Sequence, residues 1–366
     1  MQRRRVHMRT AGVARLAAHR RYGAGLAAVN QRTFGTMPDG TVVDEITVQA
    51  DGIEARVITW GAVLRDLVVR DRRGAPRHVV LGLNTIEDYL VHARNFGAIC
   101  GRVANRIAGA ALTIDGRTFA LTPNLRGRHT LHGGTIGFSR RVWRVAEQAR
   151  DAVTLALVSP DGEEGFPGTV EAHCTWRVEP PATLRVILTA RADATTAVNL
   201  APHPYFVLDD APTIDLHRLT VAAEHYTPTD ADGIPTGEIR SVANTPYDFR
   251  SGRRLYEGAA PEGGYDINLV LRRAGAAPGL LHVATLESGA GDLALAVLTT
   301  EPGLQLYDAP TLDIPVPGIG GRRYGPRAGL AIEPQRFPDA PNHAHFPSVI
   351  VRPGEISRQE SAFMFA

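Results

Sequence analysis

Hydrophobic and polar residues alternate in short runs from about Phe34 onward, which is the pattern of strands with one buried face. In TLRVILTARA (183–192), every second residue from Leu184 to Ala190 is apolar, so one face of this strand is apolar. We expect comparable strands at Thr41–Val48, Ile53–Trp60, His78–Leu83, Val153–Val158, Val170–Val178, His282–Leu286, Leu293–Leu298, Leu304–Tyr307 and Ser348–Val351.

Turn signals between these runs indicate the fold class. In ALTIDGRTFAL (111–121), two apolar runs flank Asp115–Gly116, a pair that tolerates the positive φ of a type I′ turn and predicts a tight hairpin. We expect only one short helix, near Ile86–Phe96. The 37 glycines and 25 prolines are scattered and break helices. The pattern favours an all-β fold, a large antiparallel β-sandwich with few short helices, whose loops carry the function.

The beginning of the chain differs from the rest. Residues 1–38 hold eight arginines and no acidic residue, and no apolar stretch there is long enough for a secretory signal. A disordered basic extension, an arm that touches membrane or RNA, and translated sequence upstream of the real start all fit residues 1–31, and we favour the first or the third. We therefore expect a non-catalytic extension over residues 1–32 and a single β-sandwich domain over residues 33–366.

Composition excludes several functional classes. After residue 38 the chain carries 32 arginines against 38 acidic residues, a net charge of −6, which argues against a nucleic-acid partner. No apolar stretch approaches the roughly 18 residues of a membrane helix. All 40 basic residues are arginine, so lysine Schiff bases and the Walker A loop are excluded. We expect Cys100 and Cys174 to be buried free thiols, and a reducing compartment, the cytoplasm.

Three residues are candidates for proton transfer. His132 precedes two glycines in LHGG, where a ligand can approach closely, although a lone histidine is more often a simple turn residue. His203 lies between Pro202 and Pro204, which hold its backbone extended. Glu333 follows an apolar strand, where burial would make it a better base, although an ion pair with Arg336 is a serious alternative.

Two further segments carry groups that can bind hydroxyls. GRVANRI (101–107) holds Arg102, Asn105 and Arg106, whose side chains donate hydrogen bonds in fixed geometry. YDINLVL (265–271) holds Asp266, which could accept hydrogen bonds from neighbouring hydroxyls. Each of these residues could instead be structural.

Taken together, these segments resemble the aldose 1-epimerase family, also called galactose mutarotases. The resemblance covers about residues 34–366, in the family's order, through GRVANRI, LHGG…GF, NLAPHPYF, PTGEIRSVANTPYDFR, YDINLVL, GLQLY and GLAIEPQRFPDAPNH. It implies a galactose mutarotase-like β-sandwich that interconverts the anomers of free hexoses such as galactose and glucose, with no cofactor and no metal.

The resemblance also implies roles for individual residues. His203 falls on the catalytic acid and Glu333 on the catalytic base. Substrate-binding positions match His132, Arg106, Asp266, Asn105 and Gln305. The chain departs from the family beside the acid histidine, where Pro202 replaces the usual asparagine and Pro204 the usual serine or threonine, which puts the local hydrogen bonding in doubt.

Three alternatives remain open at the level of the sequence. A hexose-6-phosphate 1-epimerase would need an arginine cluster such as Arg322, Arg323 and Arg327. A non-catalytic sugar-binding protein would share the fold without the reaction. A metal site could use the pair His343 and His345, or His132, His203 and Glu333 as ligands. The expected partner is a small sugar, with no nucleic acid and no membrane, and the expected state is a monomer or weak dimer.

Overall fold

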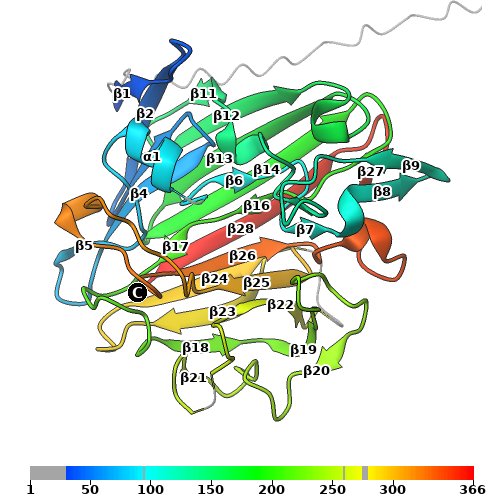
Figure 1. Ribbon diagram of the computed structural model, residues 1–366. Helices are drawn as coiled ribbons and strands as arrows, with labels where there is room; N and C mark the ends of the chain where they lie inside the picture. Colours follow the sequence, from blue (N-terminus) through cyan, green and yellow to red (C-terminus); the bar gives the residue numbers. More distant parts are fainter. Residues whose placement is uncertain (1–29, 94, 259, 274–278) are drawn as a thin grey trace, which may run out of the picture.

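Antiparallel strands dominate the computed structural model, which describes residues 30–366 apart from residues 94, 259 and 274–278 (Figure 1). Residues 1–29 of the expected basic extension lie outside the described residues, and the first strand begins at Asn30. Within the described residues, no helix is long and apolar enough to cross a membrane. The helical elements are α1 (Ile86–His92) and the 3-10 turns η1 (Ala108–Ala110), η2 (Phe138–Arg140), η3 (Glu163–Gly165), η4 (Ile319–Gly321) and η5 (Ala340–Asn342).

A five-stranded sheet comes first in the chain. In β3 the apolar side chains of Ile53, Ala55 and Val57 are buried at alternate positions, as the period of two requires. The strands follow their sequence order across the sheet: β1 (Asn30–Thr36), β2 (Val42–Ala50), β3 (Ile53–Ile58), β4 (Val63–Arg70) and β5 (Pro76–His78).

A nine-stranded sheet forms the largest layer. Strand β13 buries five alternating residues from Val170 to Val178, and it pairs with the equally long β14 without a register shift. In spatial order the strands are β11 (Arg144–Gln148), β12 (Ala152–Ser159), β13 (Val170–Glu179), β14 (Thr183–Ala192), β28 (Ser357–Phe365), β24 (Ala294–Thr299), β23 (Leu281–Glu287), β18 (Arg218–Val221) and β21 (Arg253–Arg254).

A six-stranded sheet carries most of the chemistry described below. Its spatial order is β17 (Tyr205–Phe206), β26 (Leu330–Gln335), β25 (Gly303–Tyr307), β22 (Asp266–Leu271), β19 (Ala223–Thr227) and β20 (Arg240–Ser241). Short two-stranded pairs complete the fold: β6 (Ile99–Cys100) with β16 (Ala201–Pro202), β7 (Arg106–Ile107) with β10 (Thr130–Leu131), β8 (Ala111–Ile114) with β9 (Arg117–Ala120), and β15 (Thr196–Ala197) with β27 (Ile350–Val351).

One hydrophobic core joins the three sheets. Strands β2 and β3 pack against β12, β13 and β14, and Figure 1 shows these blue and green strands side by side. Trp176 on β13 lies at this junction, fully buried, and its indole N–H donates to the carbonyl of Ala62 at 2.9 Å. The same core includes Leu286 of the nine-stranded sheet and Ile332 of the six-stranded sheet. The structure confirms the expected large antiparallel β-sandwich.

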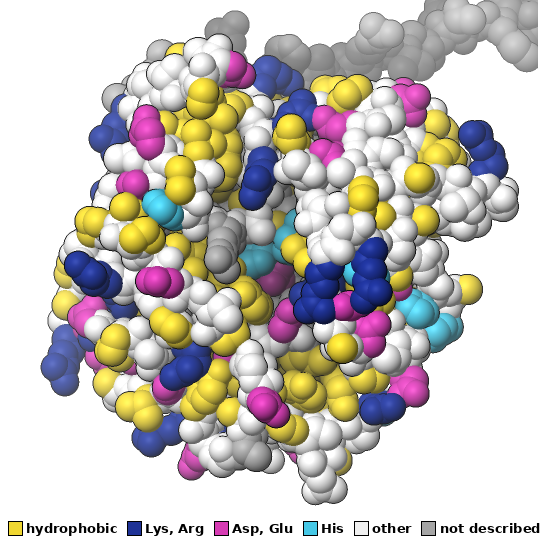
Figure 2. Space-filling model, viewed as in Figure 1, with side chains coloured by type: hydrophobic (Ala, Val, Ile, Leu, Met, Phe, Trp, Pro, Cys, Tyr) yellow, Lys and Arg dark blue, Asp and Glu magenta, His cyan; other side chains and the backbone are white. Residues whose placement is uncertain are grey.

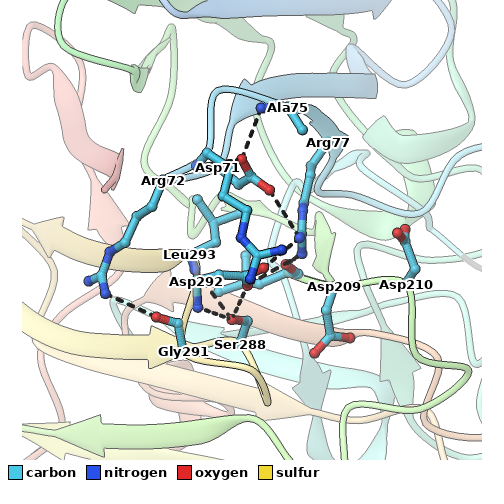
Figure 3. A network of polar contacts seen from close by, with 12 residues as sticks. Asp71, Arg72, Ala75, Arg77, Asp209, Asp210, Ser288, Gly291, Asp292 and Leu293 are labelled. Atoms are coloured by element: carbon cyan, nitrogen blue, oxygen red, sulfur yellow. Dashed lines mark hydrogen bonds and ion pairs between the residues drawn. The ribbon is translucent and has the colours of Figure 1, made fainter.

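A polar network away from the core also ties the sheets together (Figure 3). Arg77 on β5 contacts Asp71 at 3.1 Å and Asp292, in the turn between β23 and β24, at 2.5 Å. Arg72 donates to the carbonyl of Gly291. The loop after β4 is therefore attached to the nine-stranded sheet by charge-assisted hydrogen bonds, which are about twice as strong as neutral ones.

Several local expectations can be compared with the structure. The hairpin is confirmed, because Asp115 and Gly116 both have positive φ between β8 and β9. The helix starts at Ile86 as expected but ends at His92, because Asn95 and Gly97 turn the chain with positive φ. The prediction of a strand at His78–Leu83 is wrong, because no regular strand continues beyond His78 in this segment.

The backbone of residues 78–83 bonds alternately to β4 and to β17. The amide of Val79 donates to the carbonyl of Leu67 on β4, and the amide of Leu81 donates to the carbonyl of Tyr205 on β17. Only an isolated bridge at Val80 results. The other expected strands occur with shifted ends, and β27 is the shortest of them. Cys100 and Cys174 are free and buried, as expected.

Trp176→Ala should lower the free energy of unfolding by about 3–5 kcal/mol, because it leaves a cavity between two sheets and an unpaired carbonyl. Val158→Thr, at a side chain that is 55% exposed on the neighbouring β12, is the control and should change it by less than about 0.5 kcal/mol. Urea denaturation measures both. Equal midpoints for the two variants would contradict this account of the core.

Candidate active site

A cavity of about 280 Å³ opens where the six-stranded sheet meets the loops that precede β7 and follow β10. Its size lies near the lower end of small-molecule pockets, which span about 300–1,000 Å³. Figure 2 shows this hollow near the middle of the face, with histidine and acidic side chains at its floor and arginines beside it. The lining residues are Asn95, Asn105, Arg106, Leu131, His132, Arg140, His203, Tyr205, Asp266, Tyr307 and Glu333.

His203 is held rigidly on the cavity floor. It lies between β16 and β17, its amide donates to the carbonyl of Ala98, and its carbonyl accepts from the amide of Gly97. Both backbone groups of His203 are thus satisfied even though Pro202 and Pro204 flank it. The imidazole packs against the ring of Tyr205, with centroids 5.0 Å apart, and is almost fully buried.

Glu333 enters the cavity from the middle of β26, two residues before the strand ends, and not from the strand terminus that we expected. In the ladder it lies opposite Gln305 of β25. Its side chain is 2% exposed, and it does not pair with Arg336, which was the alternative raised by the sequence. One carboxylate oxygen, Oε2, is buried without a hydrogen-bond partner among the described residues.

The two groups face each other. The Nε2 atom of His203 lies 3.5 Å from Oε1 of Glu333. Burial lowers the pKa of His203 to about 4. Burial, and next the negative charge of Asp266, raise the pKa of Glu333 well above its usual value, which the charge of Arg106 opposes. Burial thus disfavours both the imidazolium form of His203 and the carboxylate form of Glu333. When the pair holds one proton, neutral imidazole with carboxylic acid is the favoured arrangement.

His132 lies beside His203, with ring centroids 5.5 Å apart. The amide of Asn105 donates to its Nδ1 at 3.2 Å, so the neutral ring carries its proton on Nε2. Burial, and next the charges of His203 and Arg106, lower the pKa of His132 well below its usual value. His132 is thus a neutral hydrogen-bond donor, suited to a hydroxyl and not to proton exchange.

Arg106 and Asp266 meet across the cavity at 2.8 Å. Asn105 accepts hydrogen bonds from the amide and the guanidinium of Arg106 and so orients it. Gln305 donates to the other carboxylate oxygen of Asp266 at 2.6 Å and is not part of the cavity wall. The seven predicted site residues therefore come together: six of them line the cavity, and Gln305 supports Asp266 from outside the cavity wall.

Arg102 takes the structural role that the sequence left open as the alternative to binding hydroxyls. It is 2% exposed, and its guanidinium donates to Ser159 and to the carbonyls of Pro160, Pro167 and Gly168. It thus ties β12 and the loop before β13 to the segment beneath His132, and it is structural.

The loop after His132 requires glycine. A side chain on Gly133 would overlap the carbonyl of Gly101, and Gly133 has positive φ. The carboxylate of Glu164 accepts hydrogen bonds from the amides of Thr135 and Ile136, which holds the loop from the outside.

A metal at this site does not fit the donor chemistry. Within the described part of the chain, one group with metal-ligand character lies close together: Cys100, His132 and His203, with ligand atoms within 4.8 Å. However, the Nε2 of His132 carries the proton, and burial raises the pKa of the Cys100 thiol well above its usual value. His343 and His345 lie elsewhere, where His345 contacts the carbonyl of Gly237 and His343 contacts Asp339.

Sequence reasoning missed several residues of the cavity wall. Tyr205 and Tyr307 lie in the quoted segments NLAPHPYF and GLQLY, so their positions were available but their orientation was not. Asn95 and Arg140 carried no signal, because each lies in an irregular loop or 3-10 turn. Arg322 and Arg327, candidates for a phosphate site, instead contact Asp210 and Asp215.

Comparison with known proteins agrees with this geometry. The family model described as aldose 1-epimerase matches residues 44–363. The chain is 36% identical to galactose mutarotase of Sus scrofa over 348 residues, covering 93% of this chain and 99% of that protein. It is 35% identical to aldose 1-epimerase of Escherichia coli (strain K12), covering 87% and 94%.

Solved structures show the same likeness. An aldose epimerase homologue from C. elegans has a TM-score of 0.82 and 33% identity, covering 88% of this chain and 98% of that chain. Galactose 1-epimerase from Lactobacillus acidophilus NCFM has a TM-score of 0.78 and 25% identity, covering 93% and 98%. Because the family model and these relatives span nearly all of the described residues, the chain belongs to the aldose 1-epimerase family.

Proposed function

We propose that this protein interconverts the α and β anomers of free hexoses such as galactose and glucose, with His203 as the acid and Glu333 as the base. One observation carries the assignment of roles: the imidazole and the carboxylate lie 3.5 Å apart, both buried, on the floor of a cavity of sugar-binding character. The family relationship supports the reaction, which is the one that the relatives' names describe.

The reaction needs two proton transfers. Protonated His203 gives its proton to the ring oxygen, while Glu333 removes the proton of the anomeric hydroxyl, and the bond between C1 and the ring oxygen breaks to leave an open-chain aldehyde. Rotation about C1–C2 exposes the other face of the aldehyde. The reverse transfers then close the ring as the other anomer and return each proton to its starting group.

Burial of the pair favours ring opening. The reacting form of the pair is imidazolium and carboxylate, which is the less favoured arrangement of its single proton, and after the step the pair is neutral imidazole and carboxylic acid. Because burial lowers the pKa of His203 and raises that of Glu333, the low-dielectric floor stabilises the neutral arrangement that accompanies the open chain. Arg106, Asp266 and His132 hold the hydroxyls meanwhile, so the aldehyde stays bound.

The alternatives have less support. Arg322 and Arg327, proposed for a phosphate, are held by acidic residues outside the cavity wall. A protein that only binds sugar would not need a buried acid–base pair. We further propose that residues 33–366 act as one catalytic domain with a non-catalytic extension over residues 1–32. We also propose that the enzyme is cofactor-free, a monomer or weak dimer, and cytoplasmic.

Glu333→Gln and His203→Asn should each lower kcat by about 10²–10⁴-fold, because each removes one proton-transfer group. Polarimetry on freshly dissolved α-glucose measures the rate, and circular dichroism verifies folding. Glu301→Gln is the matched control, since Glu301 is also buried but lies outside the cavity wall. If the wild type does not accelerate mutarotation, only the sugar-binding alternative remains. Near-normal rates in either variant would contradict the catalytic roles assigned to His203 and Glu333.

The pH dependence of kcat/KM should be bell-shaped, because the active pair carries one proton. On the acid side, activity falls when His203, with a pKa of about 4, becomes protonated and the pair holds two protons. On the alkaline side, activity falls when Glu333 loses its proton and the pair holds none. The acid limb thus lies well below the usual histidine range of about 6.5. An acid limb near that value would contradict the buried pair.

Asp266→Asn should move both limbs to lower pH. The negative charge of Asp266 raises the pKa of His203 and that of Glu333, so its removal lowers both. KM should also rise, because Arg106 and Gln305 lose their shared partner. The same pH series on Glu301→Gln provides the reference, and unchanged limbs in Asp266→Asn would rule out the charge coupling.

A further inference from the structure

The connection between β19 and β20 ends in a tight hairpin, residues 229–235, that lies against Arg106. At its tip the amide of Gly233 donates to the carbonyl of Asp230, and the amide of Asp230 donates to the carbonyl of Ile234. The side chain of Asp230 also accepts from the amides of Asp232 and Ile234. Gly233 closes the turn with a positive φ of 78°, the conformation that such a hairpin needs at this position. The hairpin is thus fixed by its own hydrogen bonds, and it forms no part of the cavity wall.

Gly233 contacts the guanidinium of Arg106 directly. A Cβ atom added to Gly233 would lie 2.9 Å from Cζ and 3.0 Å from Nε of Arg106. That Nε atom is buried and has no hydrogen-bond partner among the described residues. The two terminal nitrogens of Arg106 bond instead to Asn105 and Asp266. The hairpin therefore keeps water from the Nε side of the guanidinium, and its hydrogen-bonding capacity is directed to Asp266 and the cavity.

Asp232 fastens the hairpin to the segment before β10. Its carboxylate is 12% exposed, and it contacts Arg126 through one oxygen and Arg128 through the other. The second oxygen also lies 3.3 Å from Nε2 of His129. Because the Nδ1 atom of His129 accepts from the amide of Gly109, the neutral ring carries its proton on Nε2 and can donate it to Asp232. Three donors on one largely buried carboxylate form a network, which holds better than an isolated surface ion pair.

The base of the hairpin is fastened separately. The amide of Thr236 donates to the carbonyl of Pro228, and Nε2 of His345 lies 2.8 Å from the carbonyl of Gly237. A Cβ atom added to Gly237 would lie 3.0 Å from the ring of His343. The pair His343 and His345, considered for a metal site, thus supports this base. Since neither attachment involves Arg106, the hairpin is a fixed surface against which the side chain of Arg106 rests.

We propose that the 229–235 hairpin positions Arg106 for sugar binding: Asp232 holds Gly233 against the guanidinium, so both are positioning residues that never touch the sugar. The role rests on the proposed epimerase function, in which Arg106 holds sugar hydroxyls, and it adds the residues that hold Arg106. When the hairpin is released, the guanidinium gains water and rotational freedom, and ordering it again weakens each sugar complex.

The test measures glucose binding and turnover in Asp232→Ala and Gly233→Ala. Titration calorimetry with equilibrated glucose gives Kd, and polarimetry on fresh α-glucose gives KM and kcat. In both variants Kd and KM should rise about tenfold, the effect of losing one hydrogen bond to a charged group. The value of kcat should fall by less than about threefold, because His203 and Glu333 are untouched.

The chain offers a matched control in its other Asp-Gly hairpin. Asp115 pairs with Arg352, and Gly116 has a φ of 80°, but a Cβ atom on Gly116 would meet nothing within 4 Å. Asp115→Ala and Gly116→Ala therefore carry the same loss of an ion pair and the same backbone cost without a contact to the site. Both should leave Kd within about twofold of the wild type.

A double-variant comparison shows whether the hairpin acts through Arg106. Adding Asp232→Ala to Arg106→Gln should change Kd by less than about twofold, because the side chain that the hairpin positions is already gone. A full tenfold rise in that background would overturn the proposal, as would a wild-type Kd in either Asp232→Ala or Gly233→Ala. If glucose binds but is not anomerised, the epimerase assignment fails while the Kd series still decides the hairpin. A wild type that binds no glucose overturns both.

Discussion

Burial of one acid–base pair is the constraint on which the rest of this structure depends. His203 and Glu333 lie 3.5 Å apart and almost without exposure, and the low-dielectric floor disfavours the charge on each. On the proposed mechanism the pair holds one proton, and the buried floor favours its neutral form, which is the arrangement that ring opening produces. The same groups in water would keep their charges, and the open chain would gain nothing from their proton exchange.

Keeping the pair in place takes a rigid frame from several parts of the chain. The short strands β16 and β17 flank His203, and strand β26 carries Glu333 at a position that is paired with Gln305 of β25. Around them, Asn105 sets both the tautomer of His132 and the direction of Arg106. Arg102, through buried hydrogen bonds, and Glu164, through exposed ones, fasten the loops that bear these residues, so the site is preorganised.

The sequence by itself determined the strands, the Asp115–Gly116 hairpin, the family and the identities of the catalytic candidates, because alternation, turn chemistry and ordered motifs are local properties. It placed the end of the helix and the segment His78–Leu83 incorrectly, since both depend on partners distant in the chain. Only the tertiary structure decided that position 203 faces position 333, that Arg102 is structural, and that Arg140 borders the cavity. Juxtaposition and desolvation arise from packing between distant segments, and no local pattern encodes them.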